Sequence, residues 1–151
     1  MADIVDNKKE WDFLKQRLSK AQSLEVAVGF FEGKTGKRGN QVVEYAAFNE
    51  YGTSKAPSRP FMAITFENST QIMNKAIESE VEKVLLGRKS SSIALSSIGD
   101  KYKKELQKSI QITNFLPRLS RSTVQKKKSE KTLIDTGKML ESIEYKVRRA
   151  K

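Results

Sequence analysis

The stretch QIMNKAIESEVEKVLLG, residues 71–87, decides the fold class. Its apolar residues recur every three or four positions, which is the spacing of one face of an α-helix. They are Ile72, Met73, Ala76, Ile77, Val81, Val84 and Leu85. The stripe predicts a helix that ends near Gly87.

Three further helices are expected on similar grounds. After the linker RKSSS a second apolar stripe predicts a helix of similar length, and its members are Ala94, Ile98, Tyr102, Leu106 and Ile110. Residues 6–22 predict an N-terminal amphipathic helix, with Asp6 as its cap. Residues 41–51, QVVEYAAFNEY, favour a short helix that Gly52 closes.

Two segments are typical of strands. LEVAVGFF, residues 24–31, begins with apolar residues alternating with others and then becomes continuously apolar. The alternation of Ile143, Tyr145 and Val147 predicts a last strand, reached through a short helical turn. The whole chain, 1–151, is therefore expected to form one α+β domain. In it a small antiparallel or mixed sheet packs against two long helices plus the N-terminal helix.

Two other segments lack a helix or strand pattern. In GTSKAPSRPF, residues 52–61, two prolines fix the backbone and push their predecessors into extended conformations, which predicts an ordered, extended arm. Residues 114–131 are basic and have little apolar periodicity. We expect a flexible loop there.

The composition excludes several kinds of chemistry. The chain has no histidine and no cysteine, so serine or cysteine triads of the usual kind, disulfides and thiolate metal sites are excluded. We expect no cofactor. No apolar run approaches the ~20 residues needed to cross a bilayer, so we expect a soluble protein made in the cytoplasm that does not enter a membrane.

The segment Gly29 to Thr35 resembles a nucleotide-binding loop, because it follows a strand and ends in Gly-Lys-Thr. That motif needs four residues between its glycines so that the backbone N–H groups surround the phosphates. Here three residues separate Gly29 from Gly33, and two of them are phenylalanines. A loop at the end of a strand is the favoured interpretation.

The strong positive charge indicates an anionic partner or a flexible basic segment. The chain has 29 Lys and Arg against 18 Asp and Glu, for a formal net charge of +11. The run Lys126, Lys127 and Lys128, with Arg118 and Arg121 before it, could contact nucleic-acid phosphates without reading sequence. It could equally be a solvated loop, because no aromatic residue for base stacking lies between Arg118 and Lys131.

The motif LIDTG, residues 133–137, has two interpretations. A retroviral-type aspartic protease would pair two Asp135 side chains across a dimer. That chemistry also needs a glycine-rich flap and a later apolar strand, for which the sixteen residues after Asp135 leave no room. The favoured interpretation is structural: Asp135 is a helix N-cap, and Ile134 and Met139 form a hydrophobic staple.

Two segments together resemble a known family. They are YAAFNEYGTSKAPSRPF, residues 45–61, and LSRSTVQKKKSEKTLIDTGKMLESIEYKV, residues 119–147, with the helical SIGDKYKKELQKSI, residues 97–110, between them. Their order and spacing are similar to the signatures of tailed-phage morphogenesis proteins, the minor tail protein Z-like and related head-tail connector or tail completion proteins. The chain departs from the family pattern at Ser58 and Thr132, where prolines are expected.

The resemblance implies a non-enzymatic structural protein of the virion. It would be assembled in the bacterial host cytoplasm and located at the neck or tail, as a ring of six or twelve copies that contacts other neck and tail tube proteins. The arm would present Arg59 and Phe61 to a neighbouring subunit, because aromatic and arginine side chains dominate many interfaces. The expected subunit-interface residues are Tyr51, Gly52, Pro57, Arg59, Pro60 and Phe61. The basic loop would face DNA in the lumen. The charge alone leaves a small, basic, non-sequence-specific nucleic-acid-binding protein as the alternative.

Overall fold

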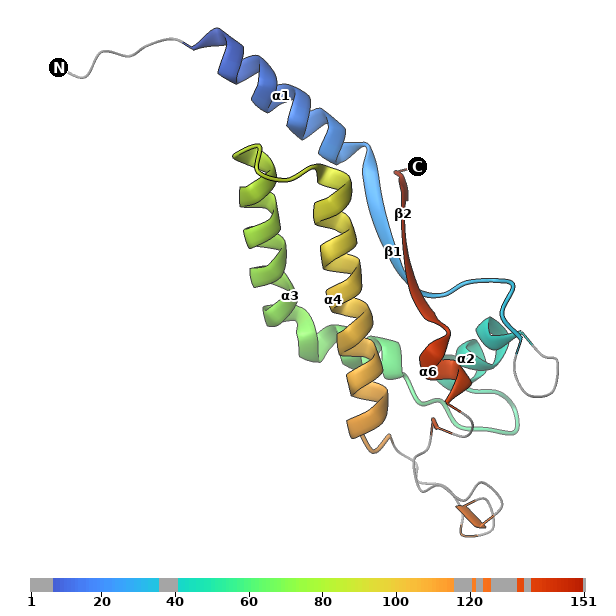
Figure 1. Ribbon diagram of the computed structural model, residues 1–151. Coiled ribbons are helices and arrows are strands. Elements are labelled where there is room, and N and C mark those ends of the chain that lie inside the picture. The colour runs from blue at the N-terminus through green and yellow to red at the C-terminus, as the bar shows by residue number, and fades with distance from the viewer. Residues whose placement is uncertain are drawn as a thin grey trace.

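The computed structural model describes residues 7–35, 41–115, 121, 124–125, 133–134 and 137–150. In these ranges the chain forms five helices and an antiparallel two-stranded sheet (Figure 1). The elements are α1 (Lys8–Gln22), β1 (Leu24–Phe30), α2 (Val42–Tyr51), α3 (Phe61–Leu85), α4 (Ser91–Ile112), α6 (Lys138–Glu141) and β2 (Ile143–Arg149). The α+β class predicted from the sequence is confirmed.

The long helices α3 and α4 lie side by side, and α4 also contacts both strands (Figure 1). At Gly99 the backbone of α4 approaches the sheet closely. A Cβ placed on Gly99 would lie 2.8 Å from Cγ2 of Val26 in β1 and 2.9 Å from the ring of Tyr145 in β2. The absence of a side chain at Gly99 therefore lets the helix backbone rest directly on the strands.

The core lies where α2, the start of α3, α4, α6 and the sheet meet. Its largest fully buried side chains are Phe61, Leu106, Ile110, Ile143 and Val42. The Phe30 and Phe61 rings pack edge to face, with their centroids 5.9 Å apart. Segments far apart in the sequence thus share one core, as expected for one domain.

Helix α3 begins at Phe61, well before the apolar stripe that predicted it. The stripe is missing from its first turns because Thr65 and Ser69 occupy buried positions there. The buried Thr65 hydroxyl donates a hydrogen bond to the Phe61 carbonyl at 2.6 Å. The Thr70 hydroxyl donates in the same way to the Phe66 carbonyl at 2.7 Å. Such bonds bend helices, and Figure 1 shows a bend in the first half of α3.

The N-terminal helix α1 extends beyond the end of the α3–α4 pair (Figure 1). It begins at Lys8 with Asn7 as N-cap, slightly later than predicted, and Asp6 lies outside the described residues. Its C-terminal half is held by Arg17, whose guanidinium donates to the Leu85 carbonyl at the end of α3 at 2.8 Å. None of its residues is fully buried, and Trp11 and Phe13 are more than half exposed.

Two kinds of feature are absent from the described residues. No helix among them is long and apolar enough to cross a membrane. Within the same ranges, histidine, cysteine, aspartate and glutamate side chains nowhere gather in a group of three or more that could hold a metal ion.

Candidate subunit interface

The α2–α3 junction, which we define as residues 45–61, carries the first signature segment, and its central element is Glu50. The Glu50 carboxylate accepts hydrogen bonds from the backbone N–H groups of Met62 at 2.9 Å and Ala63 at 3.1 Å. These N–H groups belong to the first turn of helix α3. The N-cap residue of α3 is Pro60, whose side chain cannot accept a hydrogen bond from them. Glu50 therefore supplies from α2 the cap that α3 lacks in its own sequence.

Gly52 turns the chain at the end of α2. Its φ of 78° lies in the left-handed region, and a Cβ there would come within 2.8 Å of the Ser58 backbone nitrogen. The turn that follows is closed by Thr53, whose hydroxyl accepts from the N–H of Lys55 and Ala56. The segment 52–61, predicted as an extended arm, is thus a turn followed by residues without regular secondary structure that lead directly into α3.

Two of the predicted interface residues are covered by their own chain. Phe61 is 0% exposed and forms part of the core, and Arg59 is 9% exposed. The Arg59 backbone N–H donates to the Asn49 carbonyl at 2.6 Å, which holds this residue against α2. In this structure Phe61 and Arg59 therefore position α3 and do not present their side chains to a neighbour.

The remaining residues of the predicted interface are more accessible. Tyr51 is 83% exposed and Pro57 is exposed, whereas Gly52 and Pro60 are half-buried. Phe48, three residues before Tyr51 on α2, is 54% exposed and was not among the residues predicted for the interface. An interface role for this segment remains a prediction, and Tyr51 and Phe48 are the side chains best placed to serve it.

A shallow apolar groove runs between β1 and α2 beside Tyr51. Its volume is about 230 Å³. Val43, Ala47 and Tyr51 of α2 and Met62 of α3 line it on one side. From β1 it is lined by residues 27–30, and Phe31 follows at its end. The Lys146 ammonium lies 4.2 Å from the centre of the Phe31 ring, so a cation covers part of this aromatic surface.

The loop after β1 does not form a phosphate cradle in the part that is described. Lys34, which a nucleotide site would direct at the phosphates, is paired with Glu144 of β2. The Gly33 N–H donates to the Gln41 side chain at 3.3 Å, and Thr35 pairs with Gln41 across the loop. These contacts support the interpretation of the segment as a loop at the end of a strand.

Part of the basic loop and the LIDTG motif lie outside the described residues. Of the five basic residues proposed to face DNA, the structure describes Arg121, which is exposed, and it does not describe Arg118 or residues 126–128. Asp135 is likewise not described. The predicted helix start at Asp135 was wrong, because α6 begins at Lys138 with Gly137 as N-cap. Gly137 has a φ of 76°, a left-handed turn that glycine adopts easily and that delays the helix.

A cleft lined mainly by polar residues, of about 530 Å³, lies at the other end of the molecule between α1, α3 and α4. Arg17, Lys20, Arg88 and Lys89 line it together with the first serines of α4. The Lys89 side chain is paired with Glu80 of α3, which also binds Lys83 at 2.8 Å. The hydrogen bond from Lys83 has the largest effect in lowering the pKa of the Glu80 carboxyl, and the hydrogen bond from Lys89 has the next largest.

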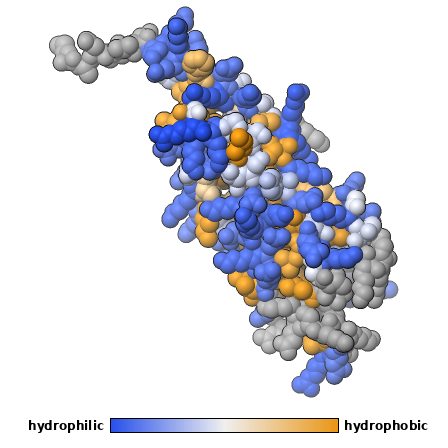
Figure 2. All heavy atoms as spheres, in the orientation of Figure 1, coloured by the Kyte–Doolittle hydropathy of each residue, from blue (hydrophilic) through white to orange (hydrophobic). Residues whose placement is uncertain are grey.

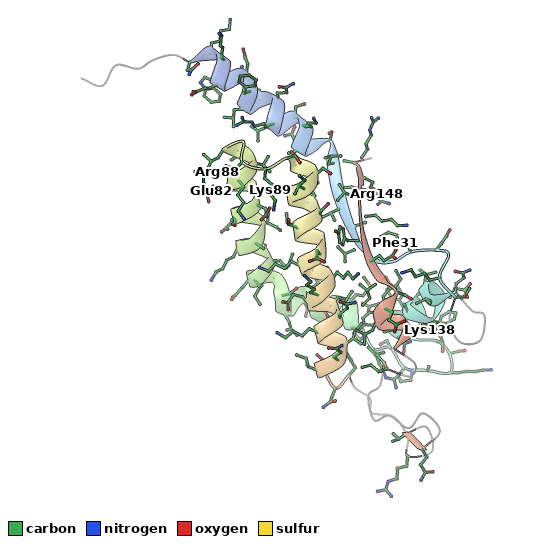
Figure 3. All side chains as sticks on the ribbon, viewed as in Figure 1. Phe31, Glu82, Arg88, Lys89, Lys138 and Arg148 are labelled. Atoms are coloured by element: carbon green, nitrogen blue, oxygen red, sulfur yellow. The ribbon has the colours of Figure 1, made fainter. Side chains whose placement is uncertain are left out.

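The visible face of the molecule is mainly hydrophilic, with hydrophobic side chains scattered among the polar ones (Figure 2). Figure 3 shows Arg88 and Lys89 near the α3–α4 loop, far from Lys138 at the start of α6. These three cations therefore do not belong to a single patch.

Comparisons with protein-family models, with curated proteins and with solved structures gave no significant match to this chain.

Proposed function

We propose that this chain is a non-enzymatic structural protein of a tailed-phage virion. In this proposal it is a tail completion, terminator or connector subunit that forms a ring of six or twelve copies at the neck. Its partners are further copies of itself and the other neck and tail tube proteins. It is assembled in the bacterial host cytoplasm and then resides in the virion.

The observation that carries the proposal is the meeting of the two signature segments. Ala46 and Phe61 belong to the first signature, and Leu133 and Met139 belong to the second. All four are buried in the same hydrophobic cluster, and α2 contacts α6 directly. Because the two signatures build one structural unit, their joint occurrence is harder to attribute to chance than either would be alone.

The accessible aromatic residues are consistent with an interface at this unit. Tyr51 and Phe48 are exposed beside the apolar groove along β1, and large exposed aromatics are typical anchors of interfaces. A contact that joins two different surfaces of the same chain can be repeated around an axis, and it forms a ring when the rotation between neighbours closes.

Negative-stain imaging of the purified protein tests the proposal. Rings with a central hole are the expected result, both alone and with isolated tail tubes added. Particles of monomer size in both samples would overturn it.

A small, basic, non-sequence-specific nucleic-acid-binding protein is the second candidate, and the net charge of +11 favours it. Salt separates the two functions. A complex driven by phosphate contacts is lost at about 0.5 M salt, whereas a ring held by apolar and backbone contacts persists.

The basic loop is proposed to face the DNA that passes through the ring. Cryo-EM of assembled virions tests this part of the proposal separately. Density for residues 118–128 on the lumen side is expected, and density on the outer surface would overturn the DNA contact without affecting the ring.

A further inference from the structure

The sheet has two free edges in the described part of the chain. β1 pairs with β2 from Leu24 opposite Arg149 to Phe30 opposite Ile143, and the order β1–β2 ends there. The Ala150 N–H donates to the Ser23 carbonyl at 3.0 Å, which fixes the phase of the ladder. In an antiparallel pair, hydrogen-bonded positions alternate with positions whose backbone groups point outward.

This phase assigns the outward-pointing residues on each strand. On β1 they are Val26, Val28 and Phe30, and on β2 they are Ile143, Tyr145 and Val147. Within the described ranges none of their outward N–H or C=O groups has a hydrogen-bond partner. Unpaired groups in a row on a strand edge are a template for a further strand.

β1 also lacks the usual protection of an edge strand. Natural edges carry lysine, proline or a bulge to prevent pairing with other chains. The β1 sequence LEVAVGF has no lysine, arginine or proline, and its register with β2 is continuous over seven residues. This edge is thus suited to accept a strand.

We propose that the free edge of β1 pairs with the free edge of β2 from a second copy of this chain. This inference rests on the proposed ring and names its interface. Because β1 and β2 are antiparallel, rotation about an axis along the strands places β2 of one copy antiparallel to β1 of the next. Each copy then offers one edge and receives the other, so the contact is head-to-tail and can close.

Charge favours this pairing over the pairing of two β2 strands. β2 carries Lys146, Arg148 and Arg149 against a single acidic residue, Glu144. Two β2 edges side by side would bring these cations together, and like charges opposite each other destabilise a sheet. β1 has no cation and one carboxylate, Glu25, which already binds Arg148 of its own chain at 2.6 Å.

The apolar groove gives the added strand a surface beside the edge. It runs along residues 27–30 of β1, and the exposed Tyr51 lies on its opposite side. Side chains of the incoming strand can cover this apolar surface while its backbone pairs with the edge. The groove and the free edge thus belong to one acceptor site.

Hydrogen exchange read residue by residue tests the pairing. The assembled protein is exposed to D₂O, returned to monomer and examined by NMR. The amides of Val26, Val28 and Phe30, and those of Ile143, Tyr145 and Val147, should exchange at least ~10-fold more slowly in the assembly than in the dilute monomer. The amides of Ala27 and Lys146 already face the partner strand within the chain and serve as internal controls that are slow in both states.

Each other outcome overturns the pairing. Protection of the β1 set without the β2 set would indicate two β1 edges in a symmetric dimer. A ring in which neither set of amides gains protection would contradict the edge pairing alone and would still agree with the proposed function. A protein that does not assemble at all would contradict both the edge pairing and the proposed function.

A matched pair of variants gives an independent readout. Val28→Pro removes an N–H that points outward, so the ladder within the chain is kept, and Val28→Ala makes a truncation that retains the N–H. We expect both variants to show the circular dichroism of a folded protein, with assembly lost in Val28→Pro and retained in Val28→Ala. Equal assembly by the two folded variants would contradict the pairing.

Discussion

Glu50 of α2 and Met62 of α3 are joined by a hydrogen bond from the Met62 backbone N–H to the Glu50 carboxylate, 2.9 Å long. A second bond from Ala63 completes the cap. This cap fixes the start of α3 against the last turn of α2, and with it the path of the chain between the two helices. The Asn-Glu pair at residues 49–50 of the first signature therefore has a structural explanation.

Replacement of Glu50 should lower the stability of the fold. Glu50→Ala leaves the first N–H groups of α3 without an acceptor, and loss of a helix cap costs about 1–2 kcal/mol of unfolding free energy. Urea denaturation followed by circular dichroism measures the difference. Glu67→Ala, an exposed position on α3, is the matched control and should change stability by less than about 0.5 kcal/mol. Equal stability of Glu50→Ala and wild type would contradict the capping role.

Gly99→Ala should destabilise the contact between α4 and the sheet. The added methyl would lie 2.8 Å from Val26 and 2.9 Å from the Tyr145 ring, so strands or helix must shift. Overpacking of this kind costs about 1–3 kcal/mol, which exceeds the gain of up to about 1 kcal/mol from the better helix propensity of alanine. Thermal unfolding of Gly99→Ala and of Ser96→Ala, a neighbouring control on α4, measures the effect. A melting temperature at or above that of wild type in Gly99→Ala would refute the close contact.

The Glu80 cluster should make part of the stability depend on pH. Hydrogen bonds from Lys83 and Lys89 lower the pKa of Glu80 in the folded state, below its ordinary value of 4.5. The stabilisation is therefore fully present above about pH 4.5 and is lost as the pH falls through the lowered folded pKa. Glu80→Gln should be less stable than wild type by about 1 kcal/mol at neutral pH, because Lys83 is partly exposed and its bond is screened.

The difference between Glu80→Gln and wild type should shrink in acid, as wild type loses its charge at this position. Denaturant titrations at a series of pH values measure it. Glu82→Gln, an exposed neighbour on α3, should show no such convergence. A stability difference that stays constant down to low pH would show that the carboxylate charge of Glu80 is not the cause.

Tyr51→Ala separates assembly from folding. Because the Tyr51 side chain is 83% exposed, its loss should change stability by less than about 0.5 kcal/mol. If Tyr51 lies at the subunit contact, the same change should weaken assembly at least ~10-fold, as truncation of an aromatic anchor does. Sedimentation over a range of concentrations measures this, with Ile93→Ala, 57% exposed at the far end of α4, as the control. Equal weakening by both variants would argue against a specific contact at Tyr51.

The sequence predicted the elements that carry a strong pattern. Both strands, α2 with its closing Gly52 and the α4 stripe were all found where periodicity placed them. The first turns of α3 were missed because Thr65 and Ser69 stand at buried positions where a stripe would need apolar residues. Composition alone does not show that the hydroxyl of a buried threonine is satisfied by its own helix.

The site was harder to predict than the fold. Pro60 next to Phe61 correctly indicated a break in helical structure, but proline is also tolerated directly before a helix, as it is here. The sequence could not show that Phe61 points into the core, because that depends on contacts with residues more than seventy positions away, such as Leu133 and Met139. The free edges of β1 and β2 could not be predicted either, because they become apparent only once the described residues are seen to form a sheet of two strands.

Native mass spectrometry of the purified protein, alone and mixed with isolated tail tubes, tests the central claim most directly. The account predicts a closed assembly of six or twelve chains of 17.1 kDa that survives about 0.5 M salt. A protein that stays at 17.1 kDa in both samples, or one that assembles solely on nucleic acid and dissociates at that salt concentration, would contradict it.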